Sequence, residues 1–180
     1  MKQPRAYSSP KLHDLVVQNI NTELESLTYI DYLYPIVHIG FNGDGDTYPS
    51  IYMNDGSIKN YMIFPDNRVR SFVFFEMDEA VVPAQIDDDD NEYSLSLVFW
   101  GNLERINTTK EYDYTSEMIN DMIKILGNLG AFDMTYTTNT DEIFDNYSLY
   151  KEEERQTLLR PNTGFKINFK INGSATCWTE

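Results

Sequence analysis

The sequence predicts an α+β fold, with a mainly antiparallel sheet and one long β-hairpin packed against two principal helices. The strongest strand pattern lies in residues 91–106, where apolar residues alternate with smaller or polar ones. A second strand pattern, residues 69–77, lies just upstream and provides the partner strand of the hairpin. Two further segments repeat apolar residues at helical spacing.

A single domain accounts for the length of the chain. At 180 residues it can bury a sizeable core, and no linker-like stretch divides it. We therefore expect a polar N-terminal arm over residues 1–9 and one α+β domain over residues 10–180. The one cysteine rules out an internal disulfide framework. No apolar run approaches the roughly 18 residues of a membrane span, and no signal-peptide pattern opens the chain.

The charge balance argues against surfaces that bind nucleic acids or anionic membranes. Fourteen Lys and Arg residues stand against 29 Asp and Glu residues, which gives a formal charge of −15. A nucleic-acid-binding surface must neutralise phosphates, so sequence-specific binding to DNA or RNA is not expected. An anionic membrane surface would also repel this chain. The acidity suits a protein that must not adhere to DNA.

The first third of the chain predicts a helix, a short strand and a hairpin. Residues 10–27 begin with a proline suited to a first helical turn and then repeat apolar side chains at helical spacing. Residues 34–41 predict a short strand with its proline near the start. Residues 42–50 read as a loop, and residues 51–64 as a hairpin that turns at Asp55-Gly56.

The long hairpin is the most distinctive predicted feature. Its first strand, residues 69–77, is apolar on both faces, which indicates cover on both sides, by a helix and by another subunit. Its second strand, residues 93–106, has one apolar face, and its other face begins polar and turns apolar. We expect a bulge or kink at Gly101, with Leu103 and Ile106 continuing the strand. Such a ribbon tends to project beyond its own core and pair with something else.

The connection inside this hairpin, residues 76–92, carries eight acids and no base, and it includes Asp87, Asp88, Asp89 and Asp90. It predicts a solvated loop. A divalent-metal site is unsupported, because adjacent aspartates in an extended chain point in opposite directions. If copies of the loop faced a channel, the acids would keep DNA from adhering to its wall.

The last third predicts one amphipathic helix and two strands. Residues 115–129 carry an apolar stripe, with Asp113 or Thr115 as the cap. Residues 132–138 resemble a strand. Residues 165–171 alternate apolar side chains with polar ones that include Lys166 and Lys170, which marks a plausible sheet edge.

Catalytic and metal-binding patterns are weak throughout, so neither an enzyme nor a cofactor is expected. Two histidines cannot build a His-rich metal site, and the nucleophile, phosphate-loop and zinc motifs are missing from the sequence. Asp44 and Asp46 match only part of a calcium loop. The 29 acidic residues still permit a carboxylate pair.

The order of the predicted elements resembles that of small neck and tail-terminator proteins of tailed bacteriophages, including crAss-like phages. Strand 93–106 running into helix 115–129, and residues 158–171 (LLRPNTGFKINFKI), carry the resemblance. It implies a structural virion protein that forms a ring at the neck–tail junction, as a portal-to-tail connector or a tail terminator. DNA would pass through this ring, assembled in the host cytoplasm, and the neighbours would be the portal and other neck or tail proteins.

The resemblance also implies how the ring would be built. Copies would associate head to tail, and sheets would continue across subunits through the two strands of the long hairpin. The residues expected on these inter-subunit strands are Phe72, Phe74, Leu95, Leu97 and Phe99. The aspartates 87–90 would face the DNA channel or a neighbouring ring, and the arm 1–9 would reach an adjacent protein.

Two other readings remain open at the level of sequence. The first is a small acidic binding or adaptor protein that mimics DNA, which tight, salt-sensitive capture of a basic protein would favour. The second is an enzyme with a carboxylate site, for which no supporting arrangement of residues is visible.

Overall fold

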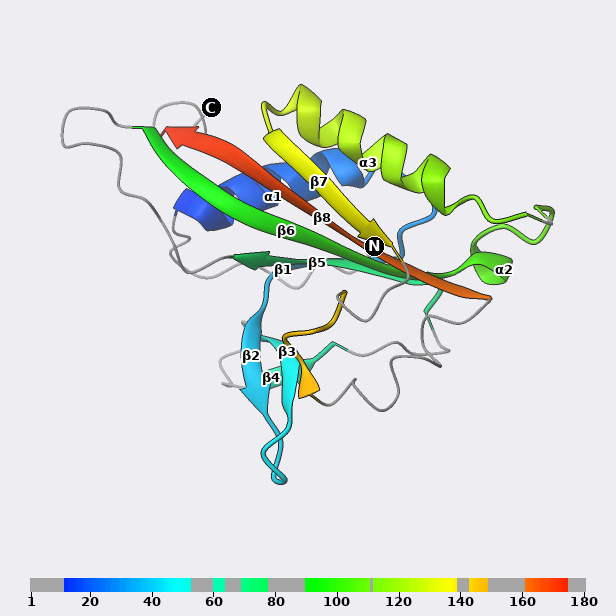
Figure 1. The fold of residues 1–180 in the computed structure, drawn as a ribbon, viewed down its shortest axis with the longest axis horizontal. Coiled ribbons are helices and arrows are strands. Elements are labelled where there is room, and N and C mark those ends of the chain that lie inside the picture. The colour runs from blue at the N-terminus through cyan, green and yellow to red at the C-terminus, as the bar shows by residue number, and fades with distance from the viewer. Residues whose placement is uncertain are drawn as a thin grey trace.

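A twisted sheet runs through the middle of the protein. The computed structural model describes residues 12–52, 60–63, 69–77, 90–110, 112–138, 143–148 and 161–174. In these residues five strands pair in the order β1-β5-β6-β8-β7, and only the β1–β5 pair is parallel (Figure 1). The strands of this large sheet are β1 (Tyr32–Ile36), β5 (Ser71–Met77), β6 (Asp90–Asn102), β7 (Phe132–Thr138) and β8 (Asn162–Ser174). The expected α+β class is confirmed.

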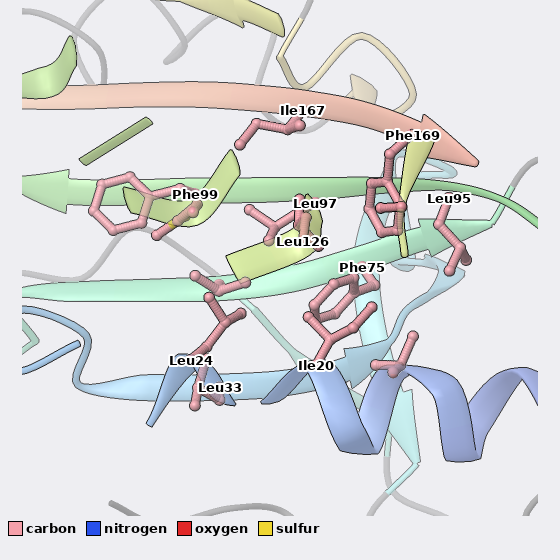
Figure 2. Packing of buried hydrophobic residues seen from close by; sticks show 14 of the residues in the cluster. Ile20, Leu24, Leu33, Phe75, Leu95, Leu97, Phe99, Leu126, Ile167 and Phe169 are labelled. Carbon is pink, nitrogen blue, oxygen red and sulfur yellow. The ribbon is translucent and has the colours of Figure 1, made fainter. Parts of the chain in front are cut away.

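Two helices cover one face of the large sheet, which we call the helical face. They are α1 (Leu12–Leu24) and α3 (Thr115–Asn128), close to the predicted ranges. Leu95, Leu97 and Phe99 of β6 all point to this side, because alternate residues of a strand share a face. Figure 2 shows side chains from both helices and the sheet directed into this core. Each large apolar side chain buried here contributes roughly 1.5–3 kcal/mol.

The opposite face of the large sheet carries an aromatic cluster that the chain covers by itself. Phe72 stacks on Trp100 at a centroid distance of 5.4 Å, and Phe74 packs against Phe144 and Tyr147. The cover comes from residues 143–148 and from a small sheet, ordered β2-β3-β4. Its strands are β2 (His38–Phe41), β3 (Thr47–Tyr52) and β4 (Asn60–Met62). The expectation that another subunit covers this face is therefore wrong.

One predicted strand proves to be two. Residues 34–41 divide between β1 in the large sheet and β2 in the small one. The break falls at Val37, whose side chain is buried and whose backbone N–H donates to the carbonyl of Phe75 at 2.8 Å. Pro35 lies inside β1, which is tolerated because β1 is an edge strand. The β3–β4 pair confirms the predicted hairpin, although its turn lies outside the described residues.

The long strand also ends earlier than the sequence suggests. The short helix α2 (Leu103–Ile106) replaces its last four residues, because the side chain of Asn102 accepts a hydrogen bond from the backbone N–H of Arg105 and caps the turn. Gly101 is not a bulge, since strand pairing continues unbroken through it. A Cβ at this position would lie 2.8 Å from Ile106, so the glycine allows α2 to fold back closely.

The two ends of the large sheet are β1 and β7, and not the strands expected from the sequence. β8 was predicted at an edge because of its lysines, but it pairs with β6 on one side and β7 on the other. Its lysines instead form ion pairs, Lys166 with Glu76 and Lys170 with Glu92, each at 2.8 Å. The sheet therefore offers edges at β1 and β7 only, within the described residues.

Candidate assembly surface

The strands expected to join subunits lie in the centre of the sheet. β5 pairs with β1 and β6, and β6 pairs with β5 and β8, so neither offers an edge along the shared length. The five side chains named for this role are all at most 2 % exposed: Phe72, Phe74, Leu95, Leu97 and Phe99. This expectation is corrected, because a strand paired on both sides cannot extend a sheet into a neighbour.

The acidic connection falls mostly outside the described residues, Asp87, Asp88 and Asp89 among them. Asp90 is the first residue of β6, where its backbone is in register with Ser174. At the two flanks of the connection, Glu76 and Glu92 are engaged by the lysines of β8. The role proposed for the aspartates as a channel lining stays a prediction.

A better candidate for contact with other molecules is the hairpin formed by β2 and β3, which projects away from the large sheet (Figure 1). Its turn is held by Asn42, whose side-chain oxygen accepts the backbone N–H groups of Asp44 and Asp46 at 3.0 and 2.8 Å. Gly45 takes a positive φ of 89°, which glycine adopts without strain. The sequence predicted a loop here, and the structure makes it the tip of a defined hairpin.

The turn end of this hairpin is fixed to the body through residues far away in the chain. The backbone N–H of Thr47 donates to the Ser148 hydroxyl at 2.8 Å, and the N–H of Ser148 donates back to the Thr47 hydroxyl at 2.7 Å. Gly40 permits a second close contact, because a Cβ there would lie 2.6 Å from the Tyr48 ring. The hairpin is thus held in place although it projects.

One face of the hairpin is covered on β3 and open on β2. Ile39 pairs with Pro49, and Phe41 pairs with Thr47, so these four residues share a face. Segment 143–148 packs against this face at Thr47, and Pro49 is buried. Ile39 and Phe41 remain 55 % and 66 % exposed, although both are large apolar side chains.

The outer edge of β2 is also open. β2 is the terminal strand of the small sheet, and among the described residues it pairs with β3 alone. Natural edge strands are protected by being very short or by carrying lysines, prolines or bulges. β2 is short, but its four residues, His-Ile-Gly-Phe, include no lysine, proline or bulge. An open apolar edge of this kind can accept a further strand, with backbone hydrogen bonds for affinity and Ile39 and Phe41 as the apolar contact.

Sequence reasoning missed this surface. The alternation of Ile39 and Phe41 was visible, but the same alternation describes a strand face that is buried in its own core. Only the position of segment 143–148, about a hundred residues later, decides that β3 is covered and β2 is not.

A second feature, an open hollow of about 630 Å³ beside α2, is a weaker candidate. Its cation Lys110 is engaged by the Glu117 carboxylate and lies 4.6 Å from the centre of the Tyr114 ring. The hydrogen bond from Lys110, and a second from Tyr112, hold the pKa of Glu117 below its ordinary value. Arg105 donates to the carbonyl of Val69. With both of its cations already engaged, the hollow offers little to an anionic ligand.

Comparison with known proteins gives no relative: no family model, curated protein or solved structure matches this chain. In the part of the chain that is described, no three His, Cys, Asp or Glu side chains come together in a way that could hold a metal ion. Over the same residues, no helix is both long and apolar enough to cross a membrane.

Proposed function

We propose that this protein is a structural component of a virion and forms a ring at the neck–tail junction of a tailed phage. In this role it is a portal-to-tail connector or a tail terminator through which DNA passes. Its work is architectural and not catalytic. Its neighbours are copies of itself and the portal, neck or tail proteins on either side, and it is assembled in the host cytoplasm.

The observation that carries the proposal is the open apolar edge of β2. Ile39 and Phe41 are exposed on an edge strand that has no lysine, proline or bulge, and the hairpin that bears them is fixed in place. An unprotected edge is a hazard for a protein that stays alone, and it is useful to one that is covered after assembly. The resemblance in element order to phage neck and tail-terminator proteins points to a ring as the assembly.

The acidity supports the same proposal. Each copy carries a formal charge of −15, so a ring of copies carries a large negative charge that repels the phosphates of passing DNA. A conduit needs this property, because DNA that adheres to the wall cannot move.

The test is the mass and symmetry of the assembled particle. We expect the full chain, alone or mixed with the portal and tail proteins of its virion, to form a discrete oligomer with rotational symmetry. Analytical ultracentrifugation gives its mass, and negative-stain imaging gives its symmetry. A chain that stays monomeric at every concentration, alone and with those partners, contradicts the proposal.

A variant at the candidate surface sharpens this test. The Phe41 side chain is 66 % exposed, so about two thirds of its apolar surface is available to be buried in each contact. Phe41→Glu removes this surface, and we expect each association step to weaken about tenfold. Tyr112→Glu is the matched control, since Tyr112 is 57 % exposed and lies outside both sheets. The control should assemble like the parent chain.

The net charge also favours a second candidate, a small acidic adaptor that mimics DNA. This candidate predicts a monomer that captures a basic protein in a strongly salt-sensitive manner. Phe41→Glu should not change the capture of a basic protein, whereas it should impair the assembly of a ring. The variant therefore distinguishes the two candidates.

A further inference from the structure

The large sheet has an open edge of its own at β7. β7 is the terminal strand of the β1-β5-β6-β8-β7 order, and in the described part of the chain it pairs with β8 alone. Tyr136 in this strand is 59 % exposed. Among the described residues four large apolar side chains are exposed, and three of them lie on terminal strands: Ile39 and Phe41 on β2, and Tyr136 on β7.

The usable length of the β7 edge matches that of β2. Asp133 has a positive φ of 51°, and the register of β7 on β8 shifts between Phe132 and Thr135. This irregularity disrupts the start of the edge and leaves Thr135–Thr138 as four consecutive residues in regular pairing. The four residues of β2, His38–Phe41, are likewise all in regular pairing with β3.

The charges on the two edges permit contact between copies despite the charge of −15. Residues 135–138 read Thr-Tyr-Thr-Thr and carry no charge, and β2 carries none when His38 is neutral. Like charges directly opposite each other destabilise a sheet. Pairing these two strands would place no such charges opposite each other. The acids at the hairpin tip, Asp44 and Asp46, lie beyond the end of β2.

We propose that β2 of one copy adds to the β7 edge of the next copy, so that Ile39 and Phe41 contact Tyr136. This inference rests on the proposed function and names the contact that closes the ring. The two edges lie in different sheets of one chain, so the contact is head-to-tail, the type that generates rings. One such contact per subunit covers the β2 edge of one copy and the β7 edge of the next, whereas a β2–β2 contact would leave every β7 exposed.

Cross-linking in the assembled particle tests this contact. In a Cys177→Ser background, which removes the only natural thiol, Ile39→Cys and Tyr136→Cys are made as separate variants and mixed. A short bis-maleimide linker spans opposite and diagonal cross-strand neighbours, whose Cβ atoms are about 5–8 Å apart. We expect a covalent dimer from the mixture, none from either variant alone, and a ladder of multimers from the double variant.

Two controls keep the result interpretable. Tyr112→Cys replaces Tyr136→Cys as an equally exposed position off the sheets, and it should give no dimer with Ile39→Cys. Phe41→Cys with Thr138→Cys is a second pair, used if a substitution in the first pair lowers the particle mass.

The possible failures are distinguishable. A dimer from Ile39→Cys alone or from Tyr136→Cys alone indicates contact between identical edges and overturns the inference. Particles that form but give no link with either pair also overturn it, and they leave the ring proposal intact. A chain that forms no particle at all overturns both.

Discussion

Removing one partner of the Glu76–Lys166 ion pair should destabilise this protein far more than removing one partner of the exposed Lys170–Glu92 pair, and this difference is the sharpest test of the fold. Glu76 lies on β5 and Lys166 on β8, with β6 between them. On β6, Ser96 pairs with Glu76 and Val98 pairs with Lys166, so the two charged side chains meet across β6. The pair lies where the aromatic cluster of the opposite face gives way to polar residues.

The geometry sets the expected magnitude. The distance from Lys166 Nζ to Glu76 Oε2 is 2.8 Å, and the two side chains are only 14 % and 10 % exposed. At an effective dielectric constant of about 20, charges this close attract by about 6 kcal/mol, much of which offsets the cost of removing them from water. Lys166→Met would leave a buried carboxylate that, within the described residues, keeps one side-chain hydrogen bond, from Asn146 at 3.3 Å. We expect a loss of about 3–5 kcal/mol in unfolding free energy.

The assay is urea unfolding at pH 7, and the chain supplies its own control. A loss of about 3 kcal/mol should lower the urea midpoint by roughly 1–3 M. Lys170→Met is the matched control on the same strand, because the Lys170–Glu92 distance is also 2.8 Å but the side chains are 40 % and 37 % exposed. Water screens this pair, so the midpoint should change little.

The double variant Glu76→Leu, Lys166→Met completes the test. Replacing both charges by apolar side chains removes the unpaired carboxylate, so stability should return to near that of the parent chain. Two results would refute the reasoning: equal effects of Lys166→Met and Lys170→Met, or a double variant as unstable as Lys166→Met alone. Either would mean that water reaches Glu76.

Two further predictions concern the hairpin and the Asp31–Arg70 pair. Gly40→Ala should lower the unfolding free energy by about 1–3 kcal/mol, because the added Cβ would lie 2.6 Å from the Tyr48 ring. Gly43→Ala, which meets nothing within 4 Å, should be nearly neutral in the same thermal or urea measurement. Burial alone would raise the pKa of Asp31, but hydrogen bonds from Arg70 outweigh it and hold that pKa below its ordinary value. Stability from this pair should therefore be present above about pH 4 and be lost as pH falls through the lowered pKa. In the Asp31→Asn variant, the unfolding free energy should therefore fall less between pH 7 and pH 3 than it does in the parent chain. An equal fall in the variant and the parent would contradict this role of Asp31.

The sequence by itself determined which side chains are buried on the helical face. Leu95, Leu97 and Phe99 share one face of β6, as Phe165 and Ile167 share one face of β8, and this alternation is what the patterns predict. The resemblance assigns the first three to a subunit contact, but they are buried in the core of the helical face. The stripe of α3 is found in the same core. These features follow from the local period of a strand or helix combined with the burial of apolar surface, and both can be read from neighbouring residues.

The tertiary structure alone decided the order of strands and the surface left open. β8 inserts between β6 and β7, so the long hairpin becomes the centre of the sheet and its expected role at a subunit contact is lost. Ile39 and Phe41 are exposed because the Thr47–Ser148 contact, 101 residues apart in sequence, covers β3 and stops short of β2. A local pattern gives a strand its two faces. Which edge stays open depends on partners far along the chain, and no local period encodes them.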